Sequence, residues 1–212
     1  PFTELSFISL KTSSYPLNNL NLRLALAKSL NRKLISEKVS YGLRKPSRSI
    51  IPPILKKDNQ ELWPKYDYLE ARRLLQQENY CNGNILKIPL TYRSNVPADK
   101  LIALTWQEEI KSSLKDCIDI ELNGVESTTV YKNLSLGIYT AVILDWTGAY
   151  SDPEAYLTPL LSCNEIVDGI CKKGESVYSG SFWGSNKVES LFLDSEKISG
   201  IKRLEKLVEI EK

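Results

Sequence analysis

Residues 139–161 constrain the fold of this chain more than any other stretch. Residues 140–144 form an apolar run that is too short for a helix and contains β-branched side chains, so they predict a buried strand. Asp152 followed by Pro153 is typical of a helix start, with Asp as the N-cap and Pro at the first helical position. Ligands of open α/β sheets bind just beyond the carboxyl ends of strands. The segment between strand and helix, residues 145–151, is therefore the leading candidate for a binding loop.

The absence of histidine excludes several classes of enzyme and metal site. Hydrolases with a serine or cysteine nucleophile and a histidine base need an imidazole, as do histidine-containing metal sites. Catalysis would have to rest on carboxylates, lysine, tyrosine or cysteine. Methionine is also absent, so we expect the sequence to be an excised piece of a longer protein.

Size and charge indicate a globular protein without an affinity for nucleic acid. The 212 residues are 42% hydrophobic, which is enough for a buried core in one large or two small domains. The 28 basic and 26 acidic residues are interspersed and give a net charge of +2, so no face is built for phosphates. No apolar run approaches the ~20 residues that a bilayer span requires.

Four cysteines are present without any Cys-x-x-Cys pair, which argues against a zinc site. Cys163 and Cys171 bracket a loop-like stretch that a disulfide could close, and two buried or free thiols are the alternative. Cys81 and Cys117 each precede a predicted strand, so a second bridge would form if those strands were neighbours.

The hydrophobic periodicity along the chain alternates between strand and helix patterns, which predicts an α/β fold. Residues 41–64, with four prolines, are expected to be a loop. Strands are expected at 5–10, 85–92, 118–122 and 140–144, and helices at 18–30, 32–39, 67–79, 99–115, 127–136, 186–193 and 200–212.

The last three strands should be parallel, because a helix separates each from the next and such crossovers are right-handed. Their carboxyl ends then share one edge of the sheet. We expect three segments to line one cleft wall at that edge, namely residues 93–95, 124–126 and 145–152.

Several segments, in matching order and spacing, resemble the large substrate-binding proteins of bacterial peptide-type ABC importers, called solute-binding family 5. These segments are residues 7–12, residues 20–27 with Asn31 and Arg32, Pro52-Pro53, residues 68–75, and Trp146 to Gly148 through Asp152-Pro153. The resemblance covers only the second lobe of those longer proteins and a little of their hinge.

The resemblance implies that residues 1–212 are the C-terminal ligand-binding lobe of a two-lobed, periplasmic-binding-protein-like α/β protein, with a mainly parallel sheet flanked by helices. Residues 1–12 would form a hinge-proximal strand, and residues 185–212 a helical tail leading back toward the missing lobe. A periplasmic or otherwise extracytoplasmic monomer is implied, with its signal peptide in the missing N-terminal part. Its partners would be a peptide or similar small solute and the ABC permease, with no cofactor, metal or catalysis.

The candidate ligand-binding residues are Arg93, Ser94, Asp145, Trp146, Thr147, Gly148, Ala149, Tyr150, Phe182 and Trp183. In the family's peptide binders, an Asp three residues after the loop's Trp pairs with the free amino group of the peptide. Here that position is Ala149, which puts recognition of a peptide amine in doubt.

Each candidate also has a purely structural interpretation. Asp152 is expected to cap its helix rather than bind ligand. Asp145 either supplies a carboxylate or pairs with a neighbouring cation, and Trp146 either stacks on a ligand or packs under the loop. Phe182 and Trp183 either fill the core or border the cleft, and Arg93 either binds a carboxylate or lies on the surface.

Two other functions remain open at this point. One is a ligand-sensing domain of a regulator, for which reduced rather than bridged cysteines would be expected. The other is a carboxylate-based hydrolase that uses Asp145 and Asp152, which would require both acids to face one cleft with perturbed pKa values.

Overall fold

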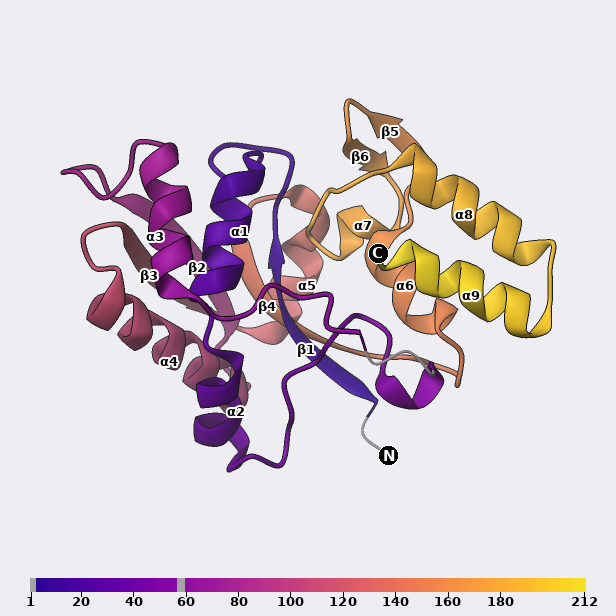
Figure 1. Cartoon of the computed structure of the whole chain (residues 1–212), viewed down its shortest axis with the longest axis horizontal. Helices are drawn as coiled ribbons and strands as arrows, with labels where there is room; N and C mark the ends of the chain where they lie inside the picture. Colours follow the sequence, from indigo (N-terminus) through magenta and orange to yellow (C-terminus); the bar gives the residue numbers. More distant parts are fainter. Residues whose placement is uncertain (1–2, 57–59) are drawn as a thin grey trace. The chain divides into compact units, whose positions relative to one another are not determined.

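A computed structural model describes residues 3–56 and 60–212, which divide into two compact units (Figure 1). The first, here the sheet unit, comprises Ile8–Pro46 and Pro64–Leu144. The second, here the helical unit, comprises Ser47–Trp63, Asp145–Lys212 and Pro1–Phe7, as far as these are described.

Four strands form one sheet, in which the order of neighbouring strands is β1-β4-β2-β3. β2 (Leu86–Arg93) pairs in parallel with both β3 (Ile118–Val125) and β4 (Ala141–Thr147). β1 (Glu4–Leu10) is antiparallel to β4. The backbone N–H of Lys11, just after β1, donates to the carbonyl of Thr140, just before β4, at 3.0 Å, so the end of one strand meets the start of the other. The three predicted parallel strands are confirmed, and one antiparallel strand makes the sheet mixed.

Two helices of the sheet unit begin at the capping residues that were predicted for them. Asn31 and Asp67 accept hydrogen bonds from the first-turn amides of Leu34 and Glu70, as expected for N-caps. The helices of this unit are α1 (Leu20–Ser29), α2 (Arg32–Ser40), α3 (Tyr68–Gln77), α4 (Pro97–Ser113) and α5 (Ser127–Asn133), which continues into the 3₁₀ turn η2 (Leu134–Leu136).

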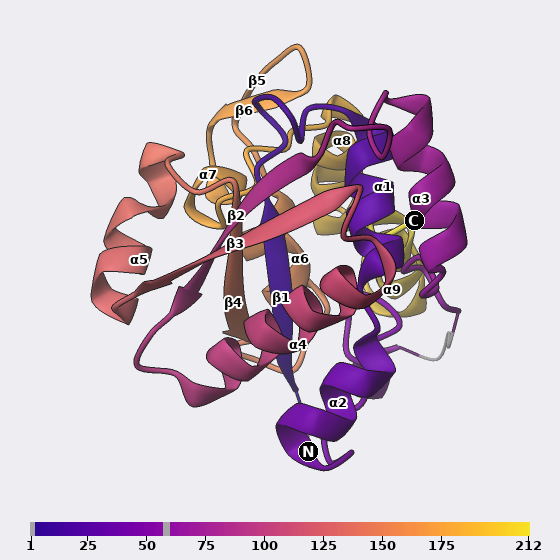
Figure 2. The same cartoon turned by 90° about the vertical axis from the view of Figure 1, so that its left-hand side faces the viewer.

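The core of the sheet unit lies between the strands and these helices. α4 packs against β2 and β3 (Figure 2). Trp106 and Ile110 on its predicted apolar stripe are buried beside Ile88 and Ile120 of the sheet. The indole N–H of Trp106 donates to the Ser29 hydroxyl at 3.1 Å, so the buried polar atom is satisfied.

The helical unit is built from short elements around a second core. A buried cluster includes Ile51, Leu157 and Leu207, and a buried ion pair joins Lys56 to Glu211. Its elements are the 3₁₀ turn η1 (Pro53–Leu55), α6 (Glu154–Leu161), the hairpin of β5 (Glu165–Val167) and β6 (Ile170–Lys173), α7 (Glu175–Tyr178), α8 (Asn186–Glu196) and α9 (Gly200–Ile210).

Each unit contains one disulfide, and both of the bridges that the sequence left open are present. Cys81 bonds to Cys117 in the sheet unit, where the cysteines precede the neighbouring strands β2 and β3. Cys163 bonds to Cys171 in the helical unit and closes the turn that contains β5.

Several expected boundaries need correction. β4 continues to Thr147, so Asp145, Trp146 and Thr147 belong to the strand rather than to the loop. Aromatic and β-branched side chains suit strands, which accounts for the longer β4. α6 begins at Glu154, one residue later than predicted, with Pro153 at the N-cap position. Within the part of the chain that the structure describes, no helix is long and apolar enough to cross a membrane.

Candidate binding loop

The loop between β4 and α6 displays small, uncharged groups. Along Thr147 to Ser151, the side chains of Thr147, Ala149, Tyr150 and Ser151 are exposed, and Tyr150 is 57% exposed despite its aromatic ring. The surface therefore consists of hydroxyl groups, one phenol ring and backbone.

A close approach to α6 fixes the base of this loop. A Cβ atom at Gly148 would lie 2.6 Å from the Tyr156 ring, so only glycine fits there. Tyr156 is buried and donates its hydroxyl to the carbonyl of Thr3 at 2.7 Å, which prevents the ring from moving aside. Gly148 is thus required by the packing of the loop, whether or not it contacts a ligand.

Trp146 also contacts α6. Its indole N–H donates to the carbonyl of Ala155 at 2.8 Å, and the side chain is half-buried. This bond supports the packing role over the stacking role. A ligand contact by the exposed part of the ring stays a prediction.

Asp152 holds the far end of the loop in two ways. One carboxylate oxygen accepts the backbone N–H of Glu154 at 2.9 Å, so the side chain caps the first turn although Pro153 occupies the N-cap position. The other oxygen accepts from Arg203 of α9 at 2.7 Å, and the same guanidinium also binds Glu154. Partial burial opposes ionisation, but the Arg203 and Glu154 hydrogen bonds outweigh it and lower the pKa of Asp152.

The phenol of Tyr150 stays protonated beside these acids. Desolvation and the negative charges of Glu154 and Asp152 raise the pKa of Tyr150. The ring therefore presents a neutral hydroxyl that can both donate and accept a hydrogen bond. Arg203 pairs with both acids and offsets part of their charge, and the exposed side chains of the loop are themselves uncharged.

Arg93 ends β2 in the sheet unit and is buried, which contradicts the alternative of a surface residue. Its guanidinium binds Asp99 of α4 through two contacts, of 2.7 and 3.0 Å, and donates to the hydroxyl of Tyr131 at 2.7 Å. The bidentate pair ties β2 to the first turn of α4. A contact between Arg93 and a ligand carboxylate stays a prediction, and the structure already gives it a carboxylate within the protein.

The residues after Arg93 lie at the surface. Ser94 is exposed and continues the β2–β3 ladder through a backbone bond of 2.8 Å to Val125. Asn95 accepts from the backbone and hydroxyl of Ser127 at the start of α5. The carboxyl ends of β2 and β3 thus meet at one edge, as predicted, with Ser94 exposed there.

Phe182 and Trp183 are half-buried in the helical unit. Phe182 packs against the Cys163–Cys171 cluster, and Trp183 packs against the core cluster that contains Leu157. The carbonyl of Phe182 accepts the Cys171 N–H at 2.8 Å, and that of Trp183 accepts the Ser176 hydroxyl at 2.7 Å. These contacts support the core-filling role, and a role at the border of a cleft stays a prediction.

The predicted site residues are thus divided between the units. Asp145 to Tyr150, Phe182 and Trp183 belong to the helical unit, whereas Arg93 and Ser94 belong to the sheet unit. The common cleft wall from three strand ends remains a prediction. Across residues 3–56 and 60–212, no cluster of three potential metal ligands occurs.

The sequence did not predict the roles of three residues that shape these sites. Arg203 lies 51 residues from Asp152, and Tyr156 acts on Gly148 through packing, so neither leaves a local signal. Asp99 could have been found, because an acid in the first turn after Pro97 is typical of a helix start next to a strand-end arginine.

Comparison with known protein families identifies the family of this chain. Residues 1–168 match the family described as "Bacterial extracellular solute-binding proteins, family 5 Middle". The chain belongs to this family.

Relatives of this family 5 chain bind several kinds of solute. Heme-binding protein A of Haemophilus influenzae is 28% identical over 170 residues, which cover 77% of this chain and 30% of that protein. The oligopeptide-binding protein OppA of Bacillus subtilis is 27% identical over 169 residues, which cover 74% of this chain and 30% of OppA. The chain thus spans about 30% of the length of these relatives.

Solved structures share the fold of this family 5 chain. Haemophilus influenzae OppA in complex with RPPGFSPFR superposes with a TM-score of 0.84 at 20% identity, over 99% of this chain and 40% of that one. HbpA2 from Haemophilus parasuis gives a TM-score of 0.83 at 24% identity, over 99% and 40%. At these identities the likeness concerns the fold alone, and it confirms the predicted α/β architecture of a periplasmic binding protein.

Proposed function

We propose that this chain is the ligand-binding lobe of an extracytoplasmic solute-binding protein that delivers a peptide or similar small solute to an ABC permease. Family membership over residues 1–168 supports a binding role. The named relatives bind oligopeptides or heme, which supports a solute with extended polar and apolar parts.

The observation that carries the proposal is the segment from Thr147, the last residue of β4, through the loop to Ser151, whose exposed side chains are uncharged. Its hydroxyl groups and backbone can hydrogen-bond the peptide groups of a solute, and the Tyr150 ring offers an apolar face. Arg203 supports this role by forming ion pairs with both acids that border the loop, Asp152 and Glu154, and so offsetting part of their negative charge.

The disulfides favour an extracytoplasmic location. Cys81–Cys117 and Cys163–Cys171 are both bridged, and such bonds persist in oxidising compartments. A sensing domain in the cytoplasm would be expected to keep these thiols reduced, so the regulator is the less supported alternative.

A hydrolase that uses Asp145 and Asp152 finds no support in the loop. A general acid needs a raised pKa, whereas hydrogen bonds from Arg203 and the Glu154 amide lower that of Asp152 against the opposing effect of burial. The relatives named above are binding proteins, which is consistent with a chain that carries out no catalysis.

We further propose that a second lobe completes the site and that the protein acts as a monomer. A two-lobed clamp buries its solute from both sides, so this chain alone should bind the solute more weakly than the longer protein does.

The test is calorimetric titration of a short peptide into the two-lobed protein and its Tyr150→Ala variant. Loss of the exposed ring should weaken binding by roughly tenfold, about 1.4 kcal/mol, with an unchanged melting temperature. Tyr178→Ala, which removes a 63% exposed ring of the same unit, is the matched control and should leave affinity unchanged. Equal affinities for wild type and Tyr150→Ala would remove the loop from the proposed site.

A further inference from the structure

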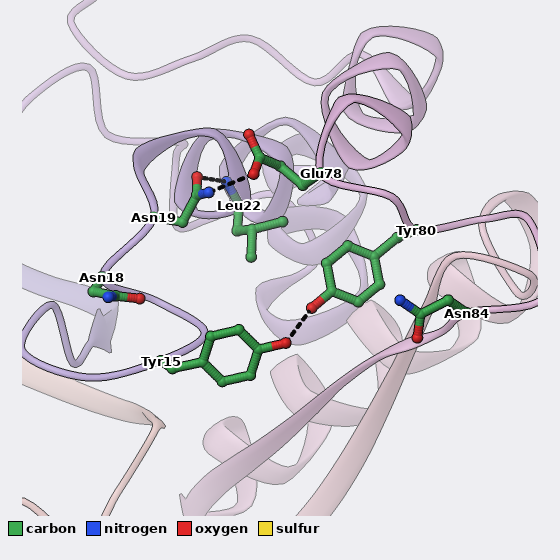
Figure 3. Close-up of a pocket in the computed structure, with 7 residues that line it drawn as sticks. All are labelled: Tyr15, Asn18, Asn19, Leu22, Glu78, Tyr80 and Asn84. Carbon is green, nitrogen blue, oxygen red and sulfur yellow. Dashed lines mark hydrogen bonds between the residues drawn. The ribbon is translucent and has the colours of Figure 1, made fainter.

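A pocket of about 450 Å³ opens in the sheet unit at the amino-terminal edge of β2, at the opposite end of that strand from Arg93 and Ser94 (Figure 3). Its size falls in the range of small-molecule sites. Two tyrosines, three asparagines and one glutamate provide its polar lining: Tyr15, Tyr80, Asn18, Asn19, Asn84 and Glu78.

The carboxylate of Glu78 is held by neutral groups only. One oxygen accepts from the Asn19 side-chain amide at 2.6 Å, and the other accepts from that of Asn21 at 2.7 Å. These donors lie at the start of α1, where the positive end of the helix dipole attracts negative charge.

No cation balances that charge among the residues that the structure places. The ion pairs of the described chain do not include Glu78, and neither Lys nor Arg lines the pocket. Glu78 is half-buried, so solvent only partly compensates its charge. The pocket is therefore electrically negative and lacks a counter-ion.

The remaining lining suits a cation that carries N–H donors. The hydroxyls of Tyr15 and Tyr80 lie 2.8 Å apart and face each other (Figure 3). Burial and this hydrogen bond raise the pKa of Tyr80 to about 12, so its ring is neutral at physiological pH. Aromatic faces attract cations. Asn84 donates through its Nδ2 to the carbonyl of Asn79 at 3.1 Å, which leaves its Oδ1 as an acceptor.

We propose that this pocket binds an organic ammonium ion, either a small primary amine or the side chain of a lysine. The ammonium group supplies the positive charge that balances the Glu78 carboxylate. Its three N–H donors match the carboxylate, phenol and amide oxygens of the lining. Its alkyl chain lies against the tyrosine rings. Anions are repelled by Glu78, and neutral solutes leave its charge unbalanced.

The test uses the whole 212-residue chain and follows side-chain amide signals by NMR. The probes are n-butylammonium, n-butanol as its neutral counterpart, and Nα-acetyl-lysine methylamide as a mimic of a protein lysine. We expect n-butylammonium to shift the amide signals of Asn18, Asn19 and Asn84 and to bind at least about tenfold more tightly than n-butanol. A response to the lysine mimic as well would indicate a peptide or protein source, and a response to n-butylammonium alone would indicate a free amine.

Glu78→Gln removes the charge with little change of shape and should weaken n-butylammonium binding by at least about tenfold. Glu205→Gln, which removes one exposed carboxylate of the helical unit, changes the net charge equally and should leave binding unchanged. If Glu78→Gln proves unstable, Tyr15→Leu replaces it, because Tyr15 is 77% exposed, and a several-fold loss is expected. Equal binding of n-butylammonium and n-butanol, or equal binding by wild type and the folded variant, would overturn the proposal.

Discussion

The ends of β2 and β4 use the same ion-pair chemistry for different purposes. At the end of β2, Arg93 and Asp99 form a bidentate pair whose side chains are only 5% and 4% exposed. After β4, Arg203 pairs with Asp152 and Glu154, and these three side chains are 25–32% exposed. In the first pair, each buried charged group has the other as its hydrogen-bonding partner in place of water. The second offsets part of the negative charge at the border of an exposed loop.

The comparison teaches that a charged residue at a strand end is a weak guide to ligand binding. Arg93 has the chemistry to bind a carboxylate, and the fold supplies one in Asp99. The proposed contacts with a solute come instead from the exposed, uncharged groups around Tyr150. Partners within the protein therefore decide whether a charged side chain at a strand end could contact a solute.

The largest expected effect is on stability, from breaking the buried pair. Arg93→Leu leaves the Asp99 carboxylate buried beside an apolar side chain and should lower the free energy of unfolding by about 3–5 kcal/mol. Urea unfolding measures the difference. Arg73→Leu, which breaks an exposed pair with Glu70, is the control and should cost less than about 1 kcal/mol. Similar losses in the two variants would contradict the weight given to burial.

A smaller effect is expected after β4. Asp152→Ala removes the acceptor of the Glu154 N–H and one of two partners of Arg203, and should lower the free energy of unfolding by about 1–2 kcal/mol. Peptide affinity of the two-lobed protein should stay within a few-fold of wild type. A large loss of affinity without a change in melting would instead make Asp152 a ligand contact.

The contribution of Asp152 should also depend on pH. Because its folded pKa is lowered, its stabilisation is present above the ordinary carboxyl pKa and is lost as the pH falls through the lower, folded value. The stability difference between wild type and Asp152→Ala should therefore shrink below about pH 4. Thermal melts across pH 2 to 7 would show it, and a difference that grows on acidification would have the wrong sign.

The smallest effect concerns the charge of the peptide terminus. Without a carboxylate at Ala149, a buried ammonium would lack a partner, so the two-lobed protein should prefer a free over an N-acetylated peptide by less than about a hundredfold, roughly 2.7 kcal/mol. Ala149→Asp should increase that preference. A larger preference in the wild type would mean that another acid, such as Asp145, anchors the amine.

Local signals predicted most of the fold. Asn31 and Asp67 cap their helices through amides only three residues away, so a short sequence window contains the whole interaction. Crossover rules predicted that β2, β3 and β4 run parallel, whereas the Cys81–Cys117 bridge was only a possibility that depended on β2 and β3 being neighbours, as the structure shows them to be.

Long-range contacts explain what the sequence left open. Residues 145–151 were predicted as the candidate loop, but the ion pairs of Arg203 with Asp152 and Glu154 depend on the docking of α9 and have no sequence pattern. The burial of Arg93 likewise depends on Tyr131, 38 residues further along the chain. The extension of β4 through Trp146 and Thr147 could have been predicted from the sequence, because both residue types suit strands.

The most direct test of the central claim is to locate a bound solute on this chain by NMR. The probe is a short peptide, acetylated and amidated so that it carries no charge and does not compete for the ammonium pocket, at millimolar concentration. We expect the largest shifts on the backbone amides of residues 148–151 and expect them to be lost in Tyr150→Ala. Large shifts elsewhere, with residues 148–151 unaffected, would contradict the claim.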